Sequence, residues 1–139
     1  MAGSGIRDRK ILVVDDSLSA RRSLIQQLEP LGYELHEASD GFEALDRIRA
    51  ERFELVFTDF EMPRMSGLDL LAEIRSSQSL DDLRVVIVTG RGEEEIRNRA
   101  TEIGTDGFLI KPAGEQELRE LLNQFEKTHV STQEAEQHE

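Results

Sequence analysis

The chain has 139 residues, of which 37% are apolar and 33% charged, so it is long enough for one globular domain and too apolar for a disordered polymer. Its 29 acidic and 17 basic residues give a formal charge of −12, which argues against binding to nucleic acid or to an anionic membrane surface. The absence of cysteine excludes disulfides, thiolate metal sites and cysteine nucleophiles, and it is compatible with a reducing, cytoplasmic location.

Short apolar runs alternate with stretches of helical periodicity along most of the chain. Residues 1–9 lack such a pattern and are predicted to be a flexible leader, residues 10–129 to be the domain, and residues 130–139 to be an acidic, flexible tail. In chain order the expected elements are strand Lys10–Val14, helix Ser19–Leu31, strand Tyr33–Ala38, helix Gly41–Glu51, strand Leu55–Thr58, helix Leu68–Ser76, strand Val85–Thr89, helix Glu93–Ile103, strand Gly107–Ile110 and helix Glu115–Lys127. The longest apolar runs are too short for a membrane span or a signal-peptide core.

This alternation of five strands with five helices predicts an α/β fold in which parallel strands are joined by right-handed crossovers and helices cover both faces of the sheet. Apolar runs such as Val85–Val88 suit strands that are buried on both faces. In open sheets of this kind, ligands bind in the crevice at the carboxyl ends of the strands. The residues that follow each strand are therefore the candidates for a functional site.

Polar side chains follow four of the five predicted strands. Asp15 and Asp16 follow the first strand, Asp59 the third, and Lys111 the fifth, while Thr89 ends the fourth. Three adjacent carboxylates repel one another unless a cation relieves them, and a bound divalent ion would stabilise their charged forms. Hard oxygen donors with no histidine or cysteine nearby favour Mg²⁺ as the cofactor.

The hydroxyl of Thr89 and the ammonium of Lys111 indicate what else this rim binds. A lysine, a hydroxyl and a metal ion are the groups that stabilise the oxygens of a phosphoryl group. An aspartate can act as the nucleophile and form an acyl phosphate, and Asp59 is the candidate because it follows a central strand. Each residue alone has a simpler interpretation, such as a helix cap for Asp15 or Asp16, and the prediction depends on their combination.

With these residues in place, the sequence resembles the receiver domain of two-component response regulators over residues 9–128. The segment DDSLSARRSL further resembles chemotaxis-type receivers. The matching motifs are ILVVDDS from Ile11 to Ser17, LVFTDFEMPRMSGLDLL from Leu55 to Leu71, VIVTG from Val86 to Gly90, and GTDGFLIKP from Gly104 to Pro112.

The resemblance implies a flavodoxin-like, doubly wound sheet of strand order 2-1-3-4-5. It also implies that Asp59 accepts a phosphoryl group from a histidine kinase or a phosphotransfer domain, assisted by Thr89 and Lys111. Mg²⁺ would be held by Asp16, Asp59 and the backbone carbonyl of Glu61, with Asp15 contacting it through water. The Lys111–Pro112 peptide bond would be cis. Such a protein is a phosphoacceptor that catalyses its own phosphorylation and dephosphorylation, and is not otherwise an enzyme.

The resemblance also assigns a hydrolysis gate and a switch. Glu61 and Arg91 flank the path of the attacking water in the family, and an ion pair between them would close the mouth of the site. Thr89 would move towards the phosphoryl group, and Phe108 would swing into the space behind it. The face formed by the fourth helix, the fifth strand and the fifth helix would then change and bind a downstream protein or a second copy of the chain.

Several alternatives remain. Residues after 128 predict no output domain, which favours a single-domain regulator, but a receiver excised from a hybrid chemotaxis-type kinase would look the same. A receiver-like interaction module that is never phosphorylated is a third possibility. A phosphatase of the haloacid dehalogenase type is disfavoured because Asp15-Asp16-Ser17-Leu18 does not match Asp-x-Asp-x-Thr, and a nucleotide-binding sheet because its first turn contains no glycine.

Overall fold

The computed structural model describes residues 9–137 of the chain, with side chains described for residues 9–126. Its centre is a parallel sheet in the order β2-β1-β3-β4-β5, so the predicted strand order and fold class are confirmed. The strands are β1 Lys10–Val14, β2 Glu34–Ala38, β3 Leu55–Asp59, β4 Arg84–Thr89 and β5 Gly107–Ile110.

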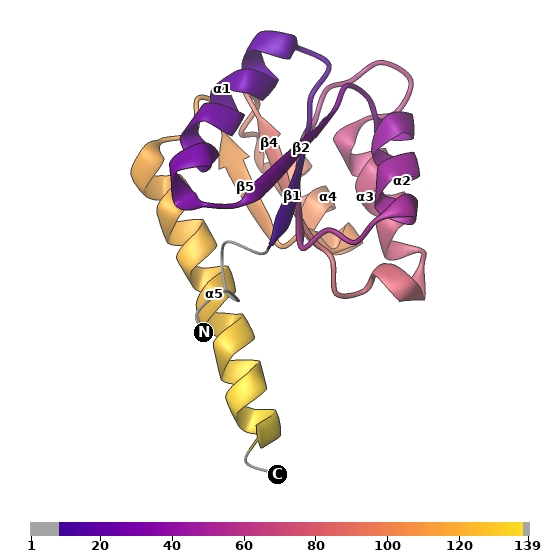
Figure 1. Ribbon diagram of the computed structural model, residues 1–139. Helices are drawn as coiled ribbons and strands as arrows, with labels where there is room; N and C mark the ends of the chain where they lie inside the picture. The colour runs from indigo at the N-terminus through magenta and orange to yellow at the C-terminus, as the bar shows by residue number, and fades with distance from the viewer. Residues whose placement is uncertain (1–8, 138–139) are drawn as a thin grey trace.

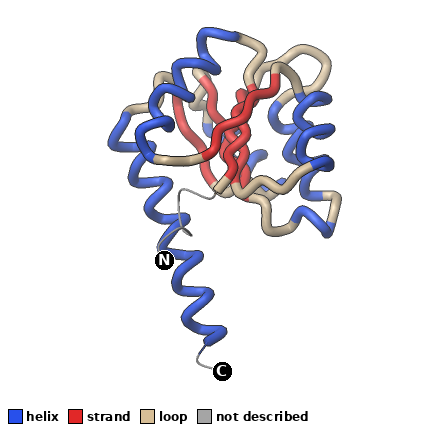
Figure 2. The backbone as a smooth tube through the Cα atoms, in the orientation of Figure 1, coloured by secondary structure: helices blue, strands red, loops and turns tan. Residues whose placement is uncertain are grey.

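Helices cover both faces of this sheet, as Figures 1 and 2 show. The α-helices are α1 Leu18–Leu28, α2 Gly41–Ala50, α3 Gly67–Arg75, α4 Glu94–Ile103 and α5 Glu115–Gln137, and the short 3₁₀ helices are η2 Glu29–Leu31 and η3 Gln78–Leu80. One apolar cluster joins the sheet to α1 and α5, and a second joins its other face to α2, α3 and α4. The three-layer arrangement follows from strands that are apolar on both faces.

The alternation of side chains along β1 shows how one short strand serves both clusters. Ile11 and Val13 belong to the cluster with α1 and α5, whereas Leu12 and Val14 belong to the cluster on the opposite face. All four are at most 2% exposed. A strand buried on both faces ends where the chain becomes polar. Asp15 and Asp16 therefore lie just after β1, at the edge of the sheet formed by the carboxyl ends of the strands.

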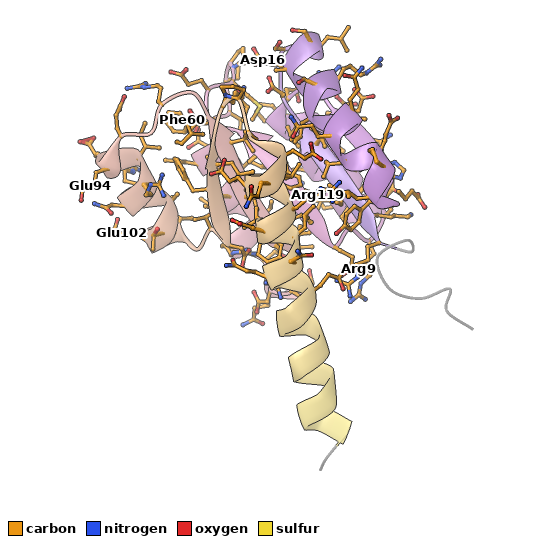
Figure 3. All side chains as sticks on the ribbon, turned by 90° about the vertical axis from the view of Figure 1, so that its left-hand side faces the viewer. Arg9, Asp16, Phe60, Glu94, Glu102 and Arg119 are labelled. Carbon is orange, nitrogen blue, oxygen red and sulfur yellow. The ribbon has the colours of Figure 1, made fainter. Side chains whose placement is uncertain are left out.

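The rim and the opposite end of the sheet are clearly separated in Figure 3, where Asp16 lies at the upper edge and Arg9, just before β1, at the lower one. All strands are parallel, so the ends of β1, β3, β4 and β5 meet at the upper rim. The fold thus places the residues that follow these strands on one edge.

The predicted element boundaries agree with the structure to within a few residues, with one larger exception. The apolar periodicity predicts that the last helix ends at Lys127, whereas α5 continues to Gln137. This prediction of the helix end was wrong because apolar periodicity reports burial and not helicity, and the residues that follow include Glu, Gln and Ala, which favour helices without packing. The predicted leader lies outside the described residues except for Arg9.

The long α5 helix projects beyond the sheet (Figure 1). Among residues 9–137, no helix combines the length and the apolar character that crossing a bilayer requires.

Candidate functional site

The connection between β1 and α1 holds Asp15 in a fixed position at the rim. The main-chain N–H of Asp15 donates to the carbonyl oxygen of Ala38 at the end of β2, and the N–H of Ser17 donates to Oδ1 of Asp15 at 2.9 Å. Ser17 caps α1 by accepting a hydrogen bond from the N–H of Ala20. Asp15 is consequently buried and immobilised, whereas its neighbour Asp16 is exposed.

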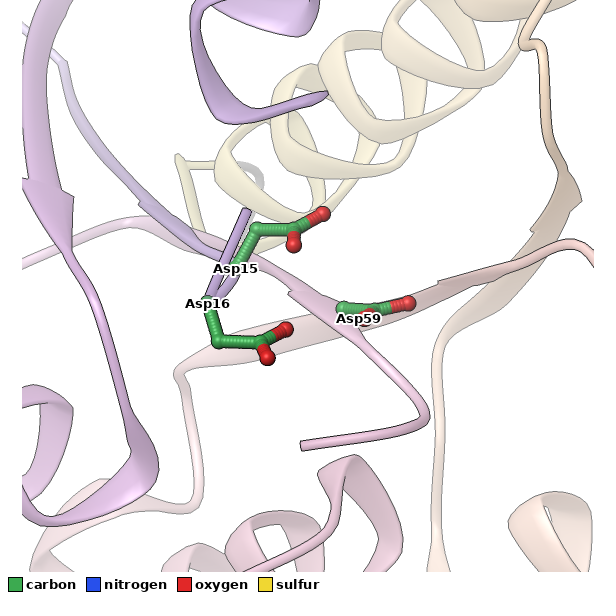
Figure 4. A group of neighbouring side chains, drawn as sticks. All are labelled: Asp15, Asp16 and Asp59. Carbon is green, nitrogen blue, oxygen red and sulfur yellow. The ribbon is translucent and has the colours of Figure 1, made fainter. Parts of the chain in front are cut away.

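Asp59 is the last residue of β3, the central strand, and lies between the residues contributed by its neighbours. Its residue exposure is 8%, and Figure 4 shows its carboxylate beside those of Asp15 and Asp16. One carboxylate oxygen from each of the three residues lies within 4.8 Å of the other two. The predicted convergence of these three side chains is confirmed.

Lys111 reaches this acidic group from the end of β5. Its Nζ donates to Oδ2 of Asp15 and lies 3.0 Å from Oδ1 of Asp59, so one ammonium bridges two carboxylates. The Lys111–Pro112 peptide bond is cis, as predicted.

The shifts in pKa reflect this partly buried cluster. Burial raises the pKa of Asp59, and the negative charge of Asp15 adds to this effect, although the hydrogen bond from Lys111 opposes it. For Lys111, burial favours the neutral amine, but the hydrogen bonds to Asp15 and Asp59 outweigh it and raise the pKa. The site therefore holds more negative charge than one lysine neutralises.

Three carboxylates supply hard oxygen ligands, and their negative charge is only partly neutralised by Lys111, so the site is suited to Mg²⁺. Asp16 is exposed, while Asp15 and Asp59 share Lys111. The residues present thus fit the metal that the sequence predicts. A cavity of about 340 Å³ between α1 and the segment after β5 has Asp15, Asp59 and Lys111 among its lining residues, and the side chain of Asp59 is 10% exposed.

Thr89 ends β4, the strand next to Asp59, and is 1% exposed. Its hydroxyl accepts a hydrogen bond from the main-chain N–H of Arg91 at 3.0 Å. Thr89 therefore lies at the predicted rim, and its hydroxyl is hydrogen-bonded to the loop that follows β4.

Glu61 and Arg91 form the predicted ion pair, with Nη1 of Arg91 3.0 Å from Oε2 of Glu61. Arg91 also pairs with Glu93 through two further nitrogens at 3.0 Å. These side chains are about half exposed, so each interaction contributes little to stability.

Phe108 lies on β5, half-buried, and packs against the cluster on the α2, α3 and α4 side. The guanidinium carbon of Arg97, on α4, lies 4.7 Å from the centre of the Phe108 ring. This stacking places the predicted switch residue at the boundary between β5 and α4.

Two residues near the site were not found by the sequence reasoning. A Cβ atom on Gly67, the first residue of α3, would lie 2.3 Å from the carbonyl oxygen of Asp59, so the helix approaches the phosphoacceptor candidate at a distance that only glycine permits. The capping box of Ser66 and Asp69 marks the start of this helix in the sequence. The second residue is Arg21, whose Nη1 donates to the carbonyl oxygen of Asp15 at 2.6 Å, and no local sequence pattern indicates that contact.

Comparison with known proteins gives a consistent result. The profile of the response regulator receiver domain matches residues 11–123. The chain is 37% identical over 120 residues to chemotaxis protein CheY-3 of Vibrio cholerae, covering 86% of this chain and 92% of that protein. It is also 37% identical over 131 residues to a probable transcriptional regulator, ycf27, of Cyanophora paradoxa, but covers only 54% of that longer protein.

Solved structures show the same similarity in three dimensions. The Vibrio cholerae chemotaxis protein CheY4 superposes with a TM-score of 0.78 at 30% identity, covering 84% of this chain and 97% of that one. The signal receiver domain of a signal transduction histidine kinase from Syntrophus aciditrophicus gives a TM-score of 0.79 at 26% identity, covering 87% and 92%.

Proposed function

Because the chain belongs to the response regulator receiver domain family, we propose that it accepts a phosphoryl group on Asp59 from a histidine kinase or a phosphotransfer domain. The single observation that supports this most directly is the meeting of Asp15, Asp16 and Asp59 within 4.8 Å at the ends of two strands, with Lys111 bonded to two of them. A receiver domain is a signalling protein, and its proposed chemistry is limited to its own phosphorylation and dephosphorylation.

In the proposed reaction an oxygen of Asp59 forms a bond to phosphorus as the bond from phosphorus to the donor's histidine nitrogen breaks. Lys111, whose Nζ lies 3.0 Å from Oδ1 of Asp59, would bind one phosphoryl oxygen, and the hydroxyl of Thr89 would bind another after leaving the N–H of Arg91. Mg²⁺ held by Asp16, Asp59 and the carbonyl of Glu61, with Asp15 contacting it through water, would neutralise charge on the carboxylates and the phosphoryl group.

A small phosphodonor tests this proposal without the cognate kinase. Treatment of the protein with acetyl phosphate and Mg²⁺ is expected to add the mass of one phosphoryl group, and EDTA should prevent the addition. A protein that gains no mass under these conditions would instead be a receiver-like module that is not phosphorylated, which is the alternative left by the sequence.

The proposal extends to the partners. The phosphoryl donor would be a kinase that uses ATP, and such a donor is compatible with a cytoplasmic location. The downstream partner, which binds the altered surface, would be another protein or a second copy of the chain. The match to the receiver domain of a histidine kinase keeps a second origin open, in which this receiver belongs to a hybrid kinase.

The Glu61–Arg91 pair is proposed to slow hydrolysis of the phosphorylated form by narrowing the path of water. Arg91→Ala should therefore speed loss of the phosphoryl group, by up to about fivefold, since an exposed pair is worth about 0–1 kcal/mol. The decay can be followed by intact mass after removal of the donor. Arg99→Ala, which removes an exposed arginine of α4, is the control and should leave the rate unchanged. Equal rates in the wild type, Arg91→Ala and Arg99→Ala would show that the Glu61–Arg91 pair does not slow hydrolysis.

The output is proposed to pass through Thr89 and Phe108 to the face formed by α4, β5 and α5. The Phe108 ring stacks on Arg97, so inward movement of the ring would release that contact and change α4. Figure 3 shows this side of the molecule, with Glu94 and Glu102 on α4 and Arg119 on α5.

Phe108→Ala should uncouple the surface change from phosphorylation. We expect Asp59 to be labelled as in the wild type while the response to beryllofluoride, measured as self-association by sedimentation or as protection of α4 amides from hydrogen exchange, is lost. A full response in the Phe108→Ala protein would show that the signal takes another route.

A further inference from the structure

Arg21, on the first turn of α1, joins three elements around the acidic site. Its Nη1 donates to the main-chain carbonyl oxygen of Asp15 at 2.6 Å, and its Nε donates to Oε1 of Glu37 at 2.7 Å. Glu37 lies on β2, opposite Val13 of β1. The side chain of Arg21 is only 12% exposed and Asp15 is buried, so the hydrogen bond between them is shielded from solvent and stronger than a surface contact.

The carbonyl oxygen of Asp15 belongs to the peptide unit that leads to Asp16. The preceding peptide unit is also held, because the N–H of Asp15 donates to the carbonyl oxygen of Ala38. Since each peptide unit is planar, fixing both units fixes the direction in which the chain enters Asp16. The carboxylate of Asp16 is exposed and has no hydrogen bond or ion pair within residues 9–126, so only its backbone defines its position.

We infer that Arg21 is a positioning residue for the Mg²⁺ site, which it serves by holding the Asp15 carbonyl so that the carboxylate of Asp16 stays beside Asp59. This inference rests on the proposed function, since it assigns a role towards the metal proposed there. Partners that orient metal ligands without touching the metal typically contribute about 10- to 100-fold to metal affinity.

Replacing Arg21 removes both a positive charge and a hydrogen bond, and these two losses should change the Mg²⁺ affinity in opposite directions, which makes the inference testable. Removing a positive charge near three carboxylates should by itself strengthen the binding of a divalent cation. Loss of the hydrogen bond to the Asp15 carbonyl should weaken it. The sign of the change in Mg²⁺ affinity therefore separates the two effects.

Arg22 is a matched control next to Arg21. Its Nε lies 3.1 Å from both carboxylate oxygens of Glu37, so it has the same charge and shares the same partner. It is 59% exposed and, unlike Arg21, has no hydrogen bond to the Asp15 carbonyl. Arg22→Met thus reports the effect of charge and of the Glu37 contact alone.

The test is titration calorimetry of the full chain with Mg²⁺ and no phosphodonor. We expect Arg21→Met to bind Mg²⁺ about 10-fold more weakly than the wild type, and Arg22→Met to bind it equally or slightly more tightly. Arg21→Lys should also bind more weakly, because a single ammonium keeps the charge but does not reproduce two donors in fixed directions. In labelling experiments Arg21→Met should need more Mg²⁺ for the half-maximal rate yet reach the wild-type maximum when Mg²⁺ saturates.

Three results would count against the inference. Mg²⁺ binding by Arg21→Met that equals or exceeds that of the wild type would show that the hydrogen bond from Arg21 to the Asp15 carbonyl is not needed for Mg²⁺ affinity. If Arg21→Met fails to fold by circular dichroism, wild-type affinity in Arg21→Lys would overturn the inference instead. A wild-type protein that binds no Mg²⁺ would remove the proposed metal site and this inference with it, whereas the first two results leave the proposed function intact.

Discussion

Asp59→Asn should reduce labelling by acetyl phosphate and Mg²⁺ to background. An amide is neither a nucleophile towards phosphorus nor a good Mg²⁺ ligand, and Asp59 is the carboxylate that lies at the end of the central strand with Lys111 3.0 Å away. Asp16→Ala should also depress labelling, through loss of a metal ligand, and a higher Mg²⁺ concentration should partly restore it. Undiminished labelling of Asp59→Asn would place the phosphoacceptor elsewhere.

Loss of labelling in Asp59→Asn should not result from unfolding. Burial and the neighbouring Asp15 raise the pKa of Asp59, so the folded state binds a proton here more tightly than the unfolded state does. The ionised carboxylate therefore costs stability at neutral pH, and this cost disappears as the pH falls through the folded and then the unfolded pKa. In EDTA we expect Asp59→Asn to be at least as stable to urea as the wild type at pH 7, with the difference shrinking in acid.

Gly67→Ala is expected to have the second large effect, because it changes the position of the phosphoacceptor without touching its chemistry. The added Cβ would lie 2.3 Å from the carbonyl oxygen of Asp59 and 3.1 Å from Cα of Phe60, and backbone atoms cannot turn aside as a flexible side chain can. The start of α3 and the end of β3 must move apart, which shifts Asp59 and also strains the hydrogen bond from the N–H of Gly67 to the carbonyl oxygen of Phe60. The cost should be about 1–3 kcal/mol in the free energy of unfolding.

Displacement of Asp59 should slow its labelling by about 10- to 100-fold, since small errors in the placement of reacting atoms have large effects on rate. Urea unfolding and the rate of mass increase measure the two effects separately. Gly90→Ala is the control, because a Cβ on Gly90 meets no atom within 4 Å, and its stability should stay within about 0.5 kcal/mol of the wild type. Gly67→Ala with wild-type stability and labelling would show that α3 moves freely relative to β3.

Much of the candidate site could be predicted because each residue follows a strand that its apolar neighbours define. Short apolar runs end next to each of these residues, and the parallel sheet brings the ends to one rim; the residues are Asp15, Asp16, Asp59, Thr89 and Lys111. The ion pair of Glu61 and Arg91 was also predicted, but from the resemblance to receiver domains, in which these positions flank the site. The part of the prediction that failed, the end of α5 at Lys127, concerns residues whose sequence shows no apolar pattern.

By itself the sequence determined the alternation of strands and helices, the two helical layers and the residues at the rim, since these follow from burial patterns that are local in the chain, whereas the strand order was implied only by the resemblance to receiver domains. Only the tertiary structure decided that Gly67 contacts the carbonyl of Asp59 and that Arg21 joins Glu37 to the carbonyl of Asp15. It also decided that Lys111 bridges Asp15 and Asp59 with one ammonium, and that the hydroxyl of Thr89 is engaged by Arg91. These contacts depend on distances of a few ångströms between backbones that are far apart in sequence, and such distances are set by how helices pack on the sheet.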